Sequence, residues 1–226
     1  MCRSAMALPD EINGPATRPG PLRVGVTGNA GSGKSLVCRR FAALGAKIVS
    51  ADVLARAALA PGSGGHAQVL KHFGVKALGP DGTLDRKALR LMILEDEAAR
   101  RTLERIVHPE VVRRIREAIE DTDPAQNPMV VVEVPLLFEV GLEQIFDIVI
   151  VVRSPRESKL QRLIRRDGVS RREAENLLNL QMPDADNADR ADFVIRNSGS
   201  RRRTIALVDQ IFTELHQKCI RGTKTA

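Results

Sequence analysis

The chain of 226 residues contains no tryptophan or tyrosine and only six phenylalanines. Its hydrophobic core must therefore be built mainly from leucine, isoleucine, valine and alanine. Proteins that bind single-stranded nucleic acids stack bases on aromatic side chains, so this composition argues against that class. The length suits one large α/β domain with insertions better than two independent cores.

Cysteines are also scarce, and the three present are Cys2, Cys38 and Cys219. An odd count without C-x-x-C spacing indicates neither a zinc site nor a disulfide framework, and a cytoplasmic location fits best. No run of about 18 apolar residues occurs, and the N-terminus lacks the apolar stretch of a signal peptide, so we expect no contact with a membrane. Residues 1–20 predict a disordered tail, and 218–226 a flexible C-terminal tail.

The formal net charge is +7, and most of the excess lies in residues 153–172. That segment holds eight basic and two acidic residues, a net charge of +6. A solvated helix face is one interpretation. A cationic patch that binds a small polyanion is the other, and we expect no nucleic-acid partner because no known binding module is present.

Five short apolar runs predict the strands of a parallel sheet, since none alternates cleanly and buried parallel strands are apolar on both faces. They are LRVGVT (22–27), AKIVSA (46–51), MVVVEV (129–134), FDIVIVV (146–152) and ADFVI (191–195). Helical segments separate them, which predicts a three-layer α/β fold.

Nearly eighty residues separate the second and third predicted strands, and they are mostly helical in pattern. They predict a helical subdomain. Pro109 predicts a break between two helices, because the residue before proline avoids the α region, and this would put His108 at a helix–helix junction. Ser170 and Glu173 have the spacing of a capping box and predict a helix start.

A phosphate-binding loop is the most specific motif. The residues that match G-x-x-x-x-G-K-[ST] are Gly28, Asn29, Ala30, Gly31, Ser32, Gly33, Lys34 and Ser35. Glycines let successive backbone N–H groups point at a phosphate, and the following helix adds its positive dipole end. Lys34 would contact the β- and γ-phosphates, Ser35 would bind Mg²⁺, and Leu36 follows where many such loops carry a second hydroxyl. Because no N-K-x-D motif for guanine is present, we expect ATP.

Two carboxylates follow predicted strands, at the edge where open α/β sheets bind ligands. Asp52, after AKIVSA, would orient a substrate hydroxyl toward the γ-phosphate or would cap the next helix. Glu133 lies inside a strand, where an unpaired carboxylate is costly, so it would either reach Mg²⁺ through water or pair with a basic residue. The arginine-rich segment would close over the phosphates as a cationic lid that excludes water.

Seven segments resemble, in order and spacing, those of dephospho-CoA kinases, over about residues 22–215. They are GNAGSGKS, SADVLAR, KHFGVKALGPDGTLDRKALR, LERIVHPEV, VPLLFE, QRLIRRDGVSRREAENLLNLQ and ADFVIRN. The resemblance implies transfer of the ATP γ-phosphate to the ribose 3′-hydroxyl of dephospho-CoA, the last step of coenzyme A synthesis. It also implies a P-loop fold with a nucleotide-binding core (21–58, 129–153 and 191–217), a helical CoA-binding subdomain (59–128) and a lid (154–190).

Site residues follow from the same resemblance. The catalytic group would be Asp52, Lys34, Arg162 and Arg166, and the dephospho-CoA site would comprise Asp52, Arg56, Arg86, His108, Pro135, Leu136, Leu137 and Glu139. Ser50 and Asn187 depart from the pattern, because the family usually has aspartate and Lys or Arg there. We expect Asn187 to weaken contacts with the nucleotide.

Other functions predict different behaviour. Another small-metabolite or nucleotide kinase would share the loop and the lid but lack the HP and PLLFE elements. An ATP-dependent switch on DNA or RNA would bind nucleic acid with steep salt dependence. We expect a monomer or small homo-oligomer.

Overall fold

The computed structural model describes residues 20–222, so Cys2 and nearly all of the predicted N-terminal tail (1–20) lie outside the described residues. The described chain folds into two compact units. The first comprises residues 20–49 and 119–222, and the second residues 50–118. The second unit thus starts and ends earlier than the helical subdomain expected at 59–128.

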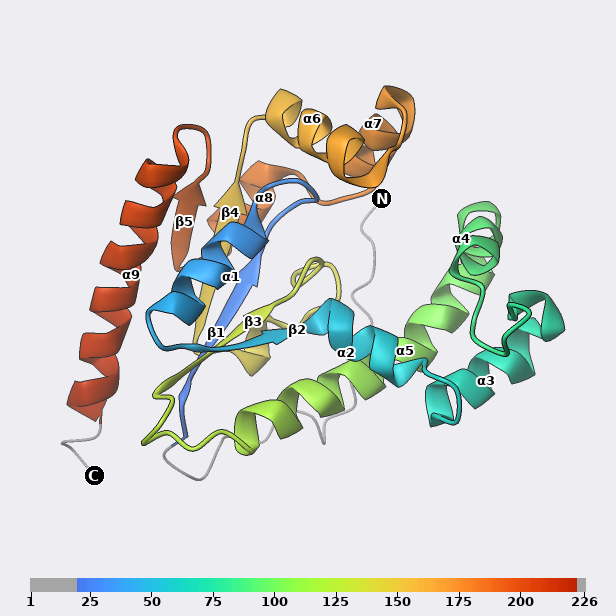
Figure 1. Cartoon of the computed structure of the whole chain (residues 1–226), viewed down its shortest axis with the longest axis horizontal. Helices are drawn as coiled ribbons and strands as arrows, with labels where there is room; N and C mark the ends of the chain where they lie inside the picture. Colours follow the sequence, from blue (N-terminus) through green and yellow to red (C-terminus); the bar gives the residue numbers. More distant parts are fainter. Residues whose placement is uncertain (1–19, 223–226) are drawn as a thin grey trace. The chain divides into compact units, whose positions relative to one another are not determined.

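A five-stranded parallel sheet forms the centre of the first unit, with strand order β2–β3–β1–β4–β5 (Figure 1). The strands are β1 (Leu22–Thr27), β2 (Lys47–Ser50), β3 (Met129–Glu133), β4 (Ile148–Arg153) and β5 (Phe193–Arg196). The central strand β1 pairs Val24 with Val131 on one side and with Ile148 on the other. All five predicted strands and the predicted α/β fold are confirmed.

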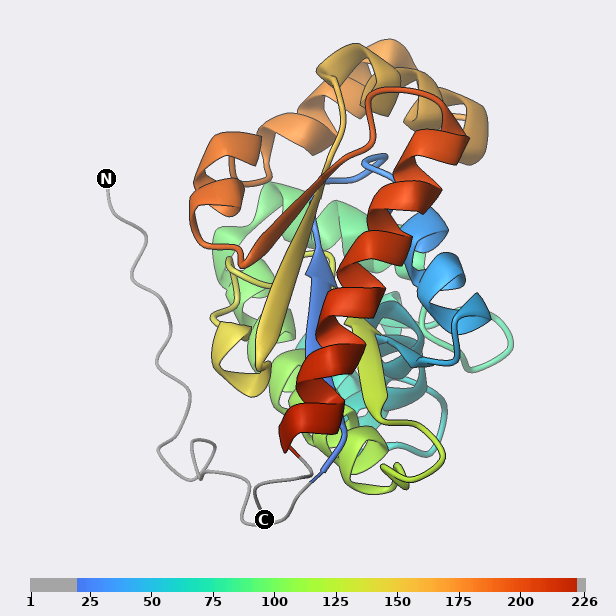
Figure 2. The same cartoon turned by 90° about the vertical axis from the view of Figure 1, so that its left-hand side faces the viewer.

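Helices α1 (Lys34–Ala43) and α9 (Arg201–Gly222) cover one face of this sheet (Figure 2). The core between them and the strands is mainly aliphatic, as the scarcity of aromatic residues requires, although Phe41 is fully buried in it and Phe193 and Phe212 pack against it. Its fully buried members include Val24, Val26, Phe41 and Leu215. Helix α1 ends before Gly45, and Gly45 has the positive φ of 98° that suits glycine after a helix.

The prediction of a C-terminal tail from residue 218 was wrong for residues 218–222. Helix α9 continues to Gly222, and residues 223–226 lie outside the described part. Cys219 on this helix lies 3.5 Å from the carbonyl oxygen of Pro128, so the last turns still contact the body of the first unit. The polar composition of this stretch concealed the end of a helix in which Cys219 is half-buried.

Residues 154–190, the expected lid, contain three helices, α6 (Arg156–Asp167), α7 (Arg171–Asn179) and α8 (Asp184–Asp189), which we call the α6–α8 segment. The predicted capping box at Ser170 and Glu173 is present, with both of its hydrogen bonds. Leu160 and Leu163 of α6 pack against Ala174 and Leu178 of α7 in a small core. Figure 1 shows α6 and α7 over the carboxyl ends of the strands, beside the loop that precedes α1.

The second unit contains helices α2 (Ala51–Ala58), α3 (Gly64–Phe73), α4 (Arg86–Glu95), most of α5 (Glu97–Glu120) and a short 3-10 helix, η2 (Val75–Ala77). Another 3-10 helix, η3 (Glu143–Ile145), precedes β4 in the first unit. The helices of the second unit share a core whose centre is Val69, Leu89 and Ile106. No helix of the described residues has both the length and the apolar character needed to cross a membrane.

The predicted break at Pro109 was wrong, because α5 runs through it as one helix of 24 residues. Proline inside a helix removes one backbone hydrogen bond and costs about 3 kcal/mol. The turns on both sides bury apolar side chains, Ile106 before the proline and Val112 and Ile115 after it. Burial of each such side chain contributes roughly 1.5–3 kcal/mol, which offsets the loss. His108 therefore lies within a helix and not at a junction.

Candidate active site

The phosphate loop occupies residues 28–33, between β1 and α1, and its glycines have backbone angles that other residues rarely adopt. Gly28, Gly31 and Gly33 have φ values of 135°, 74° and 101°. A side chain at Gly28 would collide with the carbonyl oxygen of Val152, and one at Gly33 with the side-chain amide of Asn197. Glycine is therefore required at these positions for steric as well as conformational reasons.

The loop presents donors to an anion. Lys34 is buried, and its ammonium group donates to the carbonyl oxygens of Gly28 at 2.7 Å and Asn29 at 3.3 Å. Within the described residues, the N–H groups of Gly31 and Gly33 make no hydrogen bond. With the N-terminus of α1 directly behind them, these groups form the kind of concave cationic site that binds phosphate.

Ser35 and Glu133 meet at the carboxyl end of β3. The Ser35 hydroxyl donates to Glu133 Oε1 at 3.1 Å, and in the described part of the chain Glu133 forms no ion pair with a basic residue. Among the described residues, the Glu133 carboxylate thus pairs with a hydroxyl and not with a base. A hydroxyl and a carboxylate are the hard oxygen donors that Mg²⁺ prefers, so this pair fits the ion that the loop motif implies.

Asn197 is a site residue that the sequence reasoning missed. Its side-chain nitrogen donates to the carbonyl oxygen of Ser32 at 2.8 Å, and its side-chain oxygen accepts from the Thr204 hydroxyl at 3.0 Å. The Ser154 hydroxyl donates to the Asn197 carbonyl oxygen at 2.9 Å. All four residues are buried. Ser154 and Asn197 directly follow β4 and β5, and this position at the strand ends was the available signal.

Arg162, predicted as a catalytic residue, contacts the phosphate loop from α6. Its Nη1 atom donates to the carbonyl oxygens of Gly31 at 2.9 Å and Ser32 at 3.2 Å, and to the Ser154 hydroxyl at 3.1 Å. Arg166, one turn further on, is exposed and makes a bidentate ion pair with Asp167. The arginine-rich segment is therefore partly neutralised by its own surroundings.

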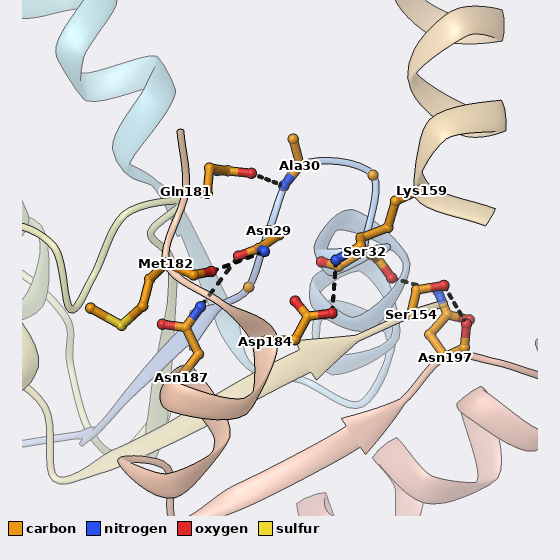
Figure 3. Close-up of polar contacts among 12 residues, drawn as sticks. Asn29, Ala30, Ser32, Ser154, Lys159, Gln181, Met182, Asp184, Asn187 and Asn197 are labelled. Atoms are coloured by element: carbon orange, nitrogen blue, oxygen red, sulfur yellow. Dashed lines mark hydrogen bonds and ion pairs between the residues drawn. The ribbon is translucent and has the colours of Figure 1, made fainter. Parts of the chain in front are cut away.

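The chain between α7 and α8 also contacts the loop (Figure 3). Gln181 Oε1 accepts the Ala30 N–H at 2.8 Å, and the Asn29 side-chain nitrogen donates to the Met182 carbonyl oxygen at 3.1 Å. Asn187 is buried and donates to Asn29 Oδ1 at 3.2 Å. Asn187 thus contacts the loop itself. A cavity of about 510 Å³ lies beside these contacts, between the loop and the α6–α8 segment.

The PLLFE turn lies in the same unit. The Thr27 hydroxyl donates to the Pro135 carbonyl oxygen at 3.5 Å, which ties the turn to the end of β1. Leu136 is exposed, but Leu137 is fully buried, so of these two leucines only Leu136 offers its side chain to a ligand. Glu139 accepts the Met182 N–H at 3.2 Å and joins the turn to the α6–α8 segment.

The remaining predicted residues belong to the second unit. Asp52 lies in the first turn of α2, and the N-cap of that helix is Ser50, so the interpretation of Asp52 as a helix cap was wrong. Its carboxylate is exposed and makes no hydrogen bond to any described residue. Arg56 and Arg86 are exposed as well. His108 is half-buried, and burial lowers the pKa of its imidazole against an opposing effect of Glu104.

Comparison with known proteins identifies the family. The model of the dephospho-CoA kinase family matches residues 22–202. A dephospho-CoA kinase of Anaeromyxobacter dehalogenans is 42% identical over 192 residues, which cover 85% of this chain and 91% of that protein. One of Geobacter metallireducens is 40% identical over 197 residues, or 87% and 98% of the two chains. The chain belongs to the dephospho-CoA kinase family.

Solved structures of the family's fold agree with this membership. A dephospho-CoA kinase from Campylobacter jejuni is 28% identical, covers 86% of this chain and 97% of its own, and has a TM-score of 0.65. The protein TT1252 from Thermus thermophilus is 33% identical, covers 87% and 98%, and has a TM-score of 0.76. The dephospho-CoA kinase family uses ATP to phosphorylate dephospho-CoA in the last step of coenzyme A biosynthesis.

Proposed function

We propose that this chain transfers the γ-phosphoryl group of ATP to the ribose 3′-hydroxyl of dephospho-CoA, giving coenzyme A and ADP. The observation that carries the proposal is the family match over residues 22–202, a range that includes the phosphate loop with its three positive-φ glycines. We also propose that it works in the cytoplasm, where Cys38 and Cys219 would remain reduced thiols, as they are here.

Phosphate binding falls to the loop and Lys34. The loop N–H groups would hold the β-phosphate, and the Lys34 ammonium, 2.7 Å from the Gly28 carbonyl oxygen, would turn toward the β- and γ-phosphate oxygens. Phosphoryl transfer depends mainly on positioning and on cationic stabilisation of the migrating group. A buried ammonium supports this role, since its interactions are less screened than those of a surface lysine.

Mg²⁺ would be held by the Ser35 hydroxyl and, through water, by Glu133. Bound there with the phosphates, the ion supplies positive charge that neutralises the transferring group. The hydrogen bond from Ser35 to Glu133 supports this assignment because it holds the hydroxyl oxygen next to a carboxylate. The described residues include no cluster of three or more metal-ligating side chains, which agrees with an ion that takes its other ligands from phosphates and water.

Asp52 would orient the acceptor hydroxyl toward the γ-phosphate. Its carboxylate is exposed and not engaged as a helix cap, so both oxygens are available to a substrate. Alignment of two reacting groups contributes a large part of many rate enhancements. Dephospho-CoA would be bound by residues of the family pattern, namely Arg56, Arg86, His108, Pro135, Leu136, Leu137 and Glu139, with Leu137 supporting from the core.

The α6–α8 segment would act as the lid. Arg162 would contribute its charge from its position at the carbonyl oxygens of Gly31 and Ser32. Arg166 would exchange its pairing with Asp167 for a phosphate when the segment closes. Closure of such segments excludes water and completes the catalytic arrangement.

An ADP-release assay with ATP and Mg²⁺ tests the proposal, with dephospho-CoA, adenosine and AMP as alternative acceptors. We expect turnover with dephospho-CoA at a kcat/KM at least about 10²-fold above the other two, because a site built for a large acceptor uses its remote contacts in catalysis. Equal or greater turnover with AMP or adenosine would reject the acceptor and assign a nucleoside or nucleotide kinase instead.

A further inference from the structure

Two residues of the phosphate loop, Asn29 and Ala30, form hydrogen bonds with residues far from the loop in sequence. Asn29 is 5% exposed and uses both ends of its side-chain amide, donating to the Met182 carbonyl oxygen and accepting from Asn187. Ala30 uses its backbone N–H to donate to Gln181. We call Gln181, Met182 and Asn187 the clasp, and Figure 3 shows them gathered around Asn29 and Ala30.

An ion pair to helix α6 also holds the clasp in place. Asp184, between Met182 and Asn187, forms an ion pair of 2.7 Å with Lys159 of α6, whose side chain is almost fully buried. The backbone of Lys159 lies against the loop, since a Cβ atom on Gly31 would be 2.7 Å from the Lys159 carbonyl oxygen. The α6–α8 segment therefore contacts the loop at successive residues, from Asn29 to Ser32.

A loop with this many glycines has high conformational entropy when it is free, and ordering it opposes ligand binding. Hydrogen bonds that order the loop beforehand remove part of that cost. Gln181 contacts the loop with an acceptor oxygen, which would repel a phosphate. Its contribution is therefore to hold the Ala30 backbone and not to bind the phosphate through that atom.

We propose that Gln181 is a positioning residue which, with Asn187, holds the Asn29–Ala30 step of the phosphate loop in its nucleotide-binding shape, so that nucleotide affinity depends on docking of the clasp. Linkage then requires the reverse effect, in which bound nucleotide stabilises the docked clasp. The inference rests on nucleotide binding by the loop, which is part of the proposed function, but it does not depend on the acceptor.

The first test uses the unmodified protein and hydrogen–deuterium exchange with and without ADP. Added ADP should slow exchange in peptides that cover residues 180–189, because the two equilibria are linked. If ADP binds, as measured by calorimetry, and exchange in this segment stays the same, the inference is overturned. If ADP does not bind at all, the proposed function falls with it.

The second test compares Gln181→Met with Gln161→Met. Methionine matches glutamine in length but lacks the acceptor, and Gln161 is an exposed glutamine on α6 of the same segment. Gln181→Met should weaken ADP binding about 3- to 10-fold, the effect expected for one partly buried hydrogen bond, and Gln161→Met should leave it unchanged. Wild-type affinity in a folded Gln181→Met variant would overturn the inference.

Steady-state kinetics separate positioning from catalysis. A residue that shapes the loop before the reaction should change KM for ATP and leave kcat nearly constant in Gln181→Met. A fall in kcat at constant KM would mean that Gln181 acts on the transition state, which contradicts the inference. If dephospho-CoA is not phosphorylated but the ADP results hold, only the acceptor assignment is lost.

Discussion

The hydroxyl of Ser35 lies 3.1 Å from the Glu133 carboxylate, and this contact joins the end of the phosphate loop to the end of β3. The strand register brings it about, because Glu133 lies opposite Val26, next to the last residue of β1. Glu133 is only partly buried there, and its carboxylate gains from a hydrogen-bond partner. The serine hydroxyl supplies one hydrogen bond and leaves the other carboxylate oxygen for a cation or its water.

Glu133→Gln should raise the Mg²⁺ concentration needed for half-maximal activity by about 10- to 100-fold, since glutamine keeps the shape and loses the charge that orients the ion's ligands. Titration of ADP release with Mg²⁺ at saturating ATP measures this. Glu214→Gln on the exposed side of α9 is the control and should match the unmodified chain. An unchanged Mg²⁺ requirement in Glu133→Gln would remove Glu133 from the metal site.

Asp52→Asn should lower kcat by at least about 10²-fold and leave ATP binding nearly unchanged, because the carboxylate is proposed to align the acceptor and not the nucleotide. Turnover with dephospho-CoA and calorimetric titration with ATP give the two quantities. Asp121→Asn, at another exposed aspartate, is the control. Near-normal turnover in Asp52→Asn would exclude Asp52 from the mechanism.

Gly31→Ala and Gly45→Ala form a matched pair. Both glycines have positive φ, so alanine carries a similar conformational cost of about 1 kcal/mol at either position. Only at Gly31 does the new Cβ meet backbone, the Lys159 carbonyl oxygen at 2.7 Å, whereas at Gly45 nothing lies within 4 Å.

We therefore expect Gly31→Ala to push α6 away from the loop and to weaken ADP binding by about tenfold or more, and Gly45→Ala to leave it unchanged while lowering stability slightly. Calorimetry for binding and urea denaturation for stability separate the two effects. Equal ADP affinities in both variants would show that close packing of α6 on the loop does not matter for nucleotide binding.

The strands and the phosphate loop were predictable because local patterns determine them. Apolar runs define buried parallel strands, and Gly28, Gly33 and Lys34 sit at fixed spacing in a motif whose geometry demands them. The contacts of Asn197 and Gln181 with the loop were not predictable from spacing, since each depends on two segments far apart in the sequence that meet only in the folded chain.

The predictions for Pro109 and Asp52 failed for another reason: each followed a local sequence preference that the surrounding structure overrides. Proline disfavours a helix interior, but burial on both sides of Pro109 outweighed it. Asp is a good N-cap, but Ser50 ends β2 and α2 begins at the next residue, so Asp52 falls inside the first turn.

His108 should make stability depend on pH. Burial lowers the pKa of its imidazole in the folded state, so below about pH 6.5 the unfolded chain binds the proton more readily than the folded chain. The free energy of unfolding should therefore decrease as the pH falls below about 6.5 and level off below the folded-state pKa. In His108→Gln the difference between pH 7.5 and pH 5.5, measured by urea denaturation, should be smaller. If this difference in unfolding free energy is the same in His108→Gln and in the unmodified chain, the burial of His108 does not contribute to the pH dependence of stability.

Pro109→Ala should stabilise the chain by about 1–3 kcal/mol, because alanine restores a backbone donor in the interior of α5 and proline is about 3 kcal/mol less favourable there. Pro124→Ala is the control. Pro124 lies in the exposed turn after α5, where no helical hydrogen bond can be regained, so alanine there should be neutral or slightly destabilising.

A proline that costs stability inside a helix, next to a residue proposed to contact dephospho-CoA, suggests that function keeps it there. The stabilised Pro109→Ala variant should then show a raised KM for dephospho-CoA and an unchanged KM for ATP. Urea denaturation and ADP-release kinetics on the same preparation measure both effects. Higher stability with unaltered kinetics in Pro109→Ala would show that the proline has no role in the reaction. Lower stability would show that α5 is more stable with proline than with alanine at this position.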